Sequence, residues 1–421
     1  MLQPLIGIPV FLFLARLAAW NRGSLNYRLL FWTLAFQGVF ACFVFRSAAG
    51  QNLFISLNSV VIALVDAALE GPRFVFGSLA DPAAAEKNGL GFILFFQGLT
   101  TIIVISALTA LLYHAGIMHR LLKLFAAIFS RLTKISGAES LAATANVFVG
   151  NESMLVIRPC LPHLTRSEFC TLLATCMATI SANVIGIYIA ALRTTMPSIA
   201  GHLVSASILS VPAAVLLAKL AVPESEKPET LGIDVQPHFE REKTLIEAVL
   251  NGGEAGFKMI AGITTMLIAV VGLLAIINVL LGWCGSQLAL PITLSIQNIL
   301  GFIFYPFVWL MGVPAADVPE VARLLGTRVI ATEIPAYFTL AGLIESGTIE
   351  QRSAVIAAYA LCGFAHLPSL AIFIGGAAAL APNRKADIAA VAWQALFAAT
   401  LACLMTGAVA GIFYNGTSIL S

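Results

Sequence analysis

The sequence predicts an all-α protein that crosses a membrane several times, and three observations support this fold class. Hydrophobic residues make up 59% of the 421 residues and charged residues only 10%, far below the quarter that is usual in soluble domains. Apolar windows of about 20 residues, the length of a membrane-spanning helix, recur along the chain. Two apolar stretches also carry carboxylates next to glycine or proline, which indicates broken helices packed inside the protein.

Spanning helices are expected where the chain stays apolar for about 20 residues. Eight windows meet this description: 2–20, 29–48, 90–113, 167–192, 200–221, 258–282, 354–379 and 389–414. Lys and Arg concentrate in every second connection between these windows, which predicts that those connections are cytoplasmic and that both termini lie outside. The basic connections are the ones that follow the first, third, fifth and seventh windows.

Other segments are expected to lie at the membrane surface. Residues 53–82 and 117–135 place apolar side chains at helical spacing between polar ones, which favours interfacial amphipathic helices. The uncharged stretch 295–314, which Pro306 interrupts, predicts a helix packed at the surface, with a ninth span as the alternative. The polar segment 223–243 predicts a loop.

The first predicted broken segment is 138–162, where Asn146, Glu152 and Arg158 stand in an apolar context around Gly150. A charge at membrane depth costs roughly 2.5–3.5 kcal/mol on insertion scales, so its presence indicates a function. We expect two half-helices that meet at an unwound tip. Two structural alternatives remain, namely that Asn146 caps a half-helix and that Glu152 pairs with Arg158.

The second predicted broken segment is 321–344, with Glu333 as its buried carboxylate. Each broken segment is followed by an Arg-Ser pair and, seventeen residues after that arginine, by a small polar residue. The two sets are Arg166, Ser167 and Asn183, and Arg352, Ser353 and Ser369. This register predicts an inverted repeat, and secondary transporters bind substrate and coupling ion between such repeats.

The polar groups separate into two candidate sites. Sodium takes oxygen ligands, which the Asn146 amide, the carbonyls near Val149, and Thr179 with Ile180 could supply. A polyhydroxylated solute needs a carboxylate with neighbouring donors, and these are available from the second set: Glu333, His366 and Ser369, with Asn151 and Glu152 at another edge. The alternatives are that Thr179 bonds its own helix and that His366 is a packing residue.

Other classes of function are disfavoured. A net charge of +2 without a basic run among aromatics argues against nucleic-acid binding. The seven cysteines are scattered through apolar segments without metal-ligand spacing, which indicates buried apolar residues and no metal cofactor. An intramembrane enzyme using Glu152, Glu333 and His366 lacks any hydrolase or metalloprotease motif. A passive channel is a further alternative.

Ten blocks of sequence occur in the order found in one family. They are residues 71–77, 113–118, 145–150, 157–169, 177–190, 205–214, 247–253, 299–314, 324–327 and 352–369, among them ANVFVG, IRPCLPHLTRSEF and MATISANVIGIYIA. The chain thus resembles the concentrative nucleoside transporter family over nearly its whole length. This resemblance implies eight spans, two re-entrant hairpins, interfacial helices, a homotrimer, and cation-driven uptake by an elevator-like movement of a transport unit on a scaffold.

The resemblance also implies roles for individual residues. The family's sodium site falls on Asn146, Val149, Thr179 and Ile180, the nucleobase side on Gly150, Glu152 and Val184, and the ribose side on Glu333 and Ser369. The chain departs from the family inside this site. Gly150-Asn151-Glu152 is one residue shorter than the family's Gly-Gln-Thr-Glu, and Thr332 and His366 stand where the family has asparagines.

We therefore predict a cation-coupled nucleoside symporter, sodium-driven, in the cytoplasmic (inner) membrane of a bacterium, with no cofactor other than the coupling ion. The alternative is proton-coupled transport of nucleosides or of another small polar solute, because His366 places an imidazole, a side chain that can carry a proton, in the predicted site. The expected parts are a scaffold in 1–136, a first transport half in 137–222, a connecting region in 223–320 and a second transport half in 321–421.

Overall fold

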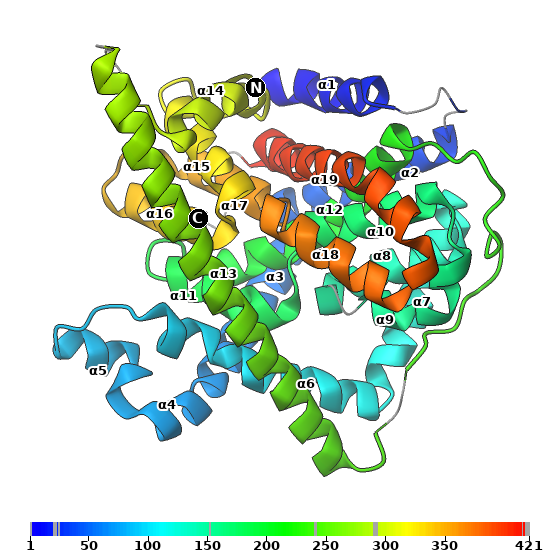
Figure 1. Ribbon diagram of the computed structural model, residues 1–421, viewed down its shortest axis with the longest axis horizontal. Helices are drawn as coiled ribbons and strands as arrows, with labels where there is room; N and C mark the ends of the chain where they lie inside the picture. The colour runs from blue at the N-terminus through cyan, green and yellow to red at the C-terminus, as the bar shows by residue number, and fades with distance from the viewer. Residues whose placement is uncertain are drawn as a thin grey trace.

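Every regular element in the described part of the chain is a helix, as the composition predicts. The computed structural model describes residues 2–19, 23, 26–150, 153–239, 242–288, 294–414 and 416. Figure 1 shows the helices in one body, with the long helix α13 (Leu245–Gln287) crossing its face and α4 (Glu70–Phe76) and α5 (Pro82–Lys87) projecting from its lower left. The predicted all-α membrane fold is confirmed.

The N-terminal region supplies the outer helices. They are α1 (Gln3–Leu17), α2 (Tyr27–Arg46), α3 (Ala48–Ala68), α6 (Thr101–His114) and α7 (Ile117–Thr133), and the π-helical turn η2 (Phe95–Leu99) leads into α6. Polar residues mark their ends. Asn26 caps α2 by accepting from the N–H of Leu29, and Ser47 ends α2 and caps α3 by accepting from the N–H of Gly50.

The remaining helices form two sets that follow the same plan. The first set is α8 (Gly137–Val149), α9 (Ser153–Val156), η4 (Arg158–His163), α10 (Arg166–Ala178), η5 (Ala182–Val184), α11 (Ile185–Leu192) and α12 (Ile199–Ala221). The second is α14 (Ile296–Leu310), α15 (Val318–Ile330), α16 (Glu333–Glu345), α17 (Gln351–Leu361), α18 (Leu367–Leu380) and α19 (Lys385–Phe413). In each set a hairpin precedes a broken span.

Among the described residues, seven helical stretches are long and apolar enough to cross a membrane, and they differ from the eight predicted windows in three places. Helix α1 has only 15 residues, and the predicted span 354–379 is divided between α17 and α18, which are each too short. Conversely, residues 48–87, where an interfacial helix is expected, include the 21-residue apolar helix α3 and meet the criterion. The stretch 295–314 forms the 15-residue helix α14 packed on α15, as expected for a surface-packed helix.

Both hairpins are anchored at the end away from the tip by a hydrogen bond between a hydroxyl and a carboxylate. Ser136 caps α8 and its hydroxyl donates to Glu168 in the first turn of α10, at 2.5 Å. Asp317 precedes α15 and accepts from the hydroxyl of Ser353 in the first turn of α17, also at 2.5 Å. The carboxylate and the hydroxyl have exchanged places between the halves. The same kind of bond therefore occurs at both hairpin bases, although Ser353 aligns with Ser167 and not with Glu168 in the Arg-Ser register.

The polar segment after α12 is not a free loop. The N–H of Gly137 donates to the carbonyl of Thr230 at 2.9 Å, and the N–H of His238 donates to the carbonyl of Val156 at 2.8 Å. The ring of Phe239 stacks on Tyr113 of α6 with centroids 4.9 Å apart. The segment therefore crosses the base of the first hairpin. Composition predicted its polarity but not this packing, since its partners lie in helices far away in the sequence.

Candidate functional site

The first broken span unwinds where the sequence places sodium ligands. Helix α10 ends at Ala178, Thr179 is extended at φ −121° and ψ 164°, and the helix resumes only after Ser181, which caps η5. The last carbonyls of a helix have no partner within it and carry its negative dipole end. Thr179 and Ile180 are both buried. Free carbonyl oxygens therefore lie inside the protein at this break.

The tip of the first hairpin lies against the same break. Helix α8 ends at Val149, and Gly150 adopts φ +60°. A Cβ on Gly150 would lie 2.7 Å from the Cβ of Ser181, so only glycine allows this approach. Two helix C-termini, those of α8 and α10, thus converge, an arrangement that favours a cation.

Neutral oxygen atoms from three elements surround Asn146, which is fully buried. Its Nδ2 donates to the carbonyl of Ala142 and to Oγ1 of Thr175, each at 3.1 Å, and its Oδ1 accepts from the hydroxyl of Ser153 at 3.0 Å. Asn146 therefore ties α8 to α9 and α10 and is not a helix cap. The hydroxyl of Thr179 donates to the carbonyl of Thr175 at 3.0 Å, so the alternative that it bonds its own helix is realised.

The second broken span unwinds beside the first. Helix α17 ends at Leu361, and a Cβ on Gly363 would lie 2.8 Å from the carbonyl oxygen of Ala178. The thiol of Cys403 in α19 lies 3.9 Å from that oxygen and 3.8 Å from the carbonyl oxygen of Cys362. The two breaks therefore meet at one place in the core, and α19 packs against both.

The carboxylate of Glu333 lies at the centre of the second site and is only 2% exposed. Its Oε1 accepts from the hydroxyl of Tyr188 at 2.7 Å, and its Oε2 lies 2.8 Å from Nε2 of His366. That nitrogen also lies 3.1 Å from Oγ of Ser369. A carboxylate oxygen can accept more than one hydrogen bond, so Oε2 retains capacity to accept from a ligand hydroxyl beside His366.

His366 has two roles in this arrangement. It caps α18, because its Nδ1 accepts from the N–H of Ser369 at 3.2 Å. A neutral ring with Nδ1 as acceptor carries its proton on Nε2, which then faces Glu333. His366 is therefore more than the packing residue of the alternative interpretation. Arg328, the nearest cation in sequence to Glu333, instead donates to the carbonyl of Ala360.

Helix ends explain how a buried carboxylate is accommodated. Glu333 is the first residue of α16 and faces the N-terminus of α18, where His366 is the cap. Helix N-termini carry partial positive charge and stabilise anions by about 0.3–1 kcal/mol each at exposed sites and more when partly buried. The second site thus uses helix N-termini, whereas the first uses helix C-termini.

The remaining predicted residues are distributed as follows. Val184 is buried in η5, three residues after Ser181. Asn151 and Glu152 lie outside the described residues, so their predicted contacts with substrate and with Arg158 stay predictions. Thr332, which replaces a family asparagine, caps α16 by accepting from the N–H of Ile334.

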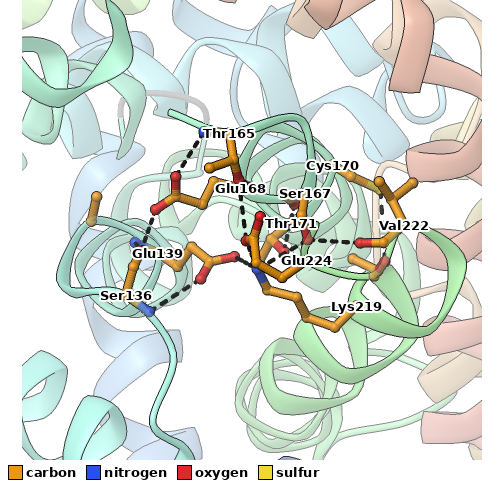
Figure 2. Close-up of polar contacts among 12 residues, drawn as sticks. Ser136, Glu139, Thr165, Ser167, Glu168, Cys170, Thr171, Lys219, Val222 and Glu224 are labelled. Carbon is orange, nitrogen blue, oxygen red and sulfur yellow. Dashed lines mark hydrogen bonds and ion pairs between the residues drawn. The ribbon is translucent and has the colours of Figure 1, made fainter. Parts of the chain in front are cut away.

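Sequence reasoning missed two groups. Tyr188 binds Glu333, and its only signal was a hydroxyl within the aliphatic run 185–192, because a buried tyrosine usually bonds its hydroxyl. Figure 2 shows the other group, at the base of the first hairpin, where Nζ of Lys219 lies 2.6 Å from Glu139 and 3.0 Å from Glu224. Glu139 is far from Lys219 and Glu224 in sequence, so no spacing could have joined it to them.

Paired hairpins and broken spans that meet inside an all-α membrane protein define the architecture of a secondary transporter. Residues 202–411 match the family described as "Na+ dependent nucleoside transporter C-terminus", residues 6–79 match its N-terminus, and residues 95–195 match "Nucleoside recognition". The chain is also 33% identical to the Bacillus subtilis transporter YutK, over 97% of this chain and 98% of that protein. The chain belongs to the Na+-dependent, concentrative nucleoside transporter family.

Other relatives agree with this assignment. Mouse solute carrier family 28 member 3 is 35% identical over 96% of this chain, which spans 58% of that longer protein. The structure of CNTnw in an inward-facing substrate-bound state has a TM-score of 0.90 at 29% identity, covering 98% of this chain and 97% of that one. An outward-facing CNTnw variant gives a TM-score of 0.89 at 28% identity, again covering 98% and 97%. These relatives are transporters, and the chain is a transporter and not an enzyme.

Proposed function

We propose that the protein is a sodium-coupled symporter that imports nucleosides across a bacterial inner membrane. The observation that carries this proposal is the meeting of two unwound junctions with opposite helix polarity. The C-termini of α8 and α10, with Asn146, suit a small cation. The carboxylate of Glu333, beside His366 and Ser369, suits the hydroxyls of a ribose.

Each predicted residue receives a role in this proposal. Sodium binds the oxygens of the first junction, which are those of Asn146, Val149, Thr179 and Ile180. The ribose hydroxyls bind Glu333 and Ser369. His366 assists them through its Nε2–H, which faces the Glu333 carboxylate. The nucleobase lies between the hairpin tip and the following span, against Gly150, Asn151, Glu152 and Val184.

An elevator movement fits the arrangement of the chain. Each hairpin packs on the broken span of its own half, α8 on α10 and α16 on α17, and α19 packs on both α10 and α17, so these helices can move as a unit. The related CNTnw has been captured in inward-facing, outward-facing and intermediate states, which supports such a movement in this chain. Assembly as a homotrimer belongs to the same proposal.

The test is uptake of radiolabelled uridine and adenosine into proteoliposomes, with and without an inward sodium gradient. The proposal predicts accumulation that requires sodium on the outside and ceases when the gradient is dissipated. Equal uptake with potassium would contradict sodium coupling, and uptake that only equilibrates would indicate a passive channel.

Proton coupling is a second candidate, because the His366 imidazole lies 2.8 Å from Glu333 within the ribose site. An inward proton gradient without sodium would then suffice for accumulation. The predicted shortening of the first hairpin tip also makes another polar solute a candidate. Thermal-shift screening of nucleosides against free bases and sugars separates these substrates, since a ligand that binds only the folded state raises the melting temperature.

A further inference from the structure

We infer that Tyr188 is a positioning residue for the substrate site, because its hydroxyl fixes the Glu333 carboxylate for the ribose hydroxyls. This inference rests on the proposed function and adds a residue to it. Tyr188 belongs to α11 in the first half of the repeat, whereas Glu333 begins α16 in the second half. The two halves are therefore joined inside the site by a side-chain hydrogen bond.

The hydroxyl of Tyr188 is directed at the Glu333 carboxylate. Its hydroxyl donates to Oε1 of Glu333 at 2.7 Å, and the side chain is fully buried. A hydrogen bond to a charged acceptor is roughly twice as strong as a neutral one and strongly directional. With Oε1 held in this way, Oε2 is turned toward His366 and is the oxygen available to a ligand.

The ring of Tyr188 is itself held in place. It packs on the ring of Tyr337, with centroids 4.8 Å apart and planes tilted by 39°. The hydroxyl of Tyr337 donates to the carbonyl of Ala358 in α17 at 2.9 Å. The two tyrosines therefore form a stack anchored on α17, with only Tyr188 bonded to the carboxylate among the described contacts of the pair.

This pairing supplies a matched control. Tyr188→Phe and Tyr337→Phe each remove one buried phenolic hydroxyl from the same stack and leave both rings in place. Tyr188→Phe removes a donor to Glu333, whereas Tyr337→Phe removes a donor to a backbone carbonyl. A purely structural contribution would make the two variants behave alike.

The experiment measures uptake of uridine and of 2′,3′-dideoxyuridine by both variants in proteoliposomes. The dideoxy compound lacks the hydroxyls that Glu333 is proposed to bind, so its uptake should not depend on how the carboxylate is oriented. We expect Tyr188→Phe to raise the KM for uridine roughly tenfold with little change in maximal rate, the effect of losing a hydrogen bond to a charged group. The KM for the dideoxy compound should change by less than about twofold.

The ratio between the two substrates is independent of how much folded protein is recovered. A KM ratio that is unchanged in Tyr188→Phe, or changed equally in Tyr337→Phe, overturns the inference. If Tyr188→Phe fails to fold, Tyr188→Leu, which also removes the hydroxyl donor, serves instead, and an unchanged ratio there overturns it as well. Failure of the wild-type protein to take up uridine would contradict the proposed function itself, which is a different result from an unchanged ratio.

Discussion

The two halves of the transport region share one plan but present opposite ends of their helices to the site. The first half brings together the C-termini of α8 and α10 and lines them with neutral oxygens around Asn146. The second half brings together the N-termini of α16 and α18 and places the carboxylate of Glu333 between them. Equivalent hairpins thus produce different electrostatic environments.

The difference teaches how one repeat can serve two ligands. Helix C-termini favour cations and helix N-termini favour anionic groups, so the same arrangement of helices suits a cation in one half and an anionic group in the other. The bases of the hairpins, by contrast, are alike, because each uses a hydroxyl–carboxylate bond of 2.5 Å. The two hairpins therefore differ in electrostatics at their tips and are alike in the anchoring bond at their bases.

The largest expected effect comes from neutralising the Glu333 carboxylate in the second half. Glu333→Gln should lower uridine uptake by more than about a hundredfold, because two hydrogen bonds to a charged acceptor are weakened at about 1.5–3 kcal/mol each. Uptake into proteoliposomes measures the loss, and a cooperative melt in detergent verifies that the variant is folded. A folded Glu333→Gln protein with normal uptake would contradict the role given to this carboxylate.

The next effect concerns the base of the first half, which contains a buried ion pair. Lys219→Met should lower the free energy of unfolding by about 3–5 kcal/mol, because the buried Glu139 then loses its cation. Thermal unfolding in detergent measures this change. Lys219→Arg is the control and should retain most of the stability, whereas a Met variant as stable as wild type would show that the cluster in Figure 2 is not a structural anchor.

The proposed sodium site is tested by removing the side-chain amide of Asn146. Asn146→Ala should raise the sodium concentration for half-maximal uptake by at least about tenfold, equivalent to about 1.4 kcal/mol, because one oxygen ligand is lost. Sodium titration of uridine uptake provides the measurement. Asn58→Ala is the matched control, since Asn58 bonds the backbone of Pro197 and Gly201 outside the junction and should leave the titration unchanged.

The smallest expected effects compare the anchoring hydrogen bonds at the bases of the two hairpins. Ser136→Ala and Ser353→Ala each remove one hydroxyl that donates to a carboxylate, and each should cost about 1–2 kcal/mol of unfolding free energy. Ser140→Ala, which removes only a bond within α8, should cost less. Ser136→Ala also removes the cap of α8, which adds to its cost. Melting curves of the three variants measure these costs, and a Ser353→Ala variant as stable as Ser140→Ala would show that the two hairpin bases are not alike.

The fold could be predicted largely because membrane insertion imposes strong constraints. Long apolar windows and carboxylates beside glycine or proline located both hairpins. The elements of the first hairpin run from Gly137 to His163, within one residue of the predicted bounds 138–162. The break within α17–α18 was not predicted, because residues 354–379 carry no Asp, Glu, Lys or Arg and hydropathy does not record where hydrogen bonding stops.

The site could be predicted only in part. Glu333, His366 and Ser369 were placed together from their spacing and the family resemblance, and the structure does bring them together. Tyr188 could not be assigned, because its partner lies 145 residues away along the chain. Similarly, Ser153 and Thr175 bind Asn146 although nothing distinguishes them locally from the many hydroxyls in membrane helices that bond their own backbone.

The proposal that sodium binds in the first half and the ribose in the second can be tested directly by the thermal shift that each ligand produces in purified protein. The account predicts that Glu333→Gln still melts at a higher temperature when sodium is added but no longer responds to uridine, and that Asn146→Ala loses the response to sodium. A Glu333→Gln protein that loses both responses, or an Asn146→Ala protein that keeps its response to sodium, would contradict the separation of the two sites.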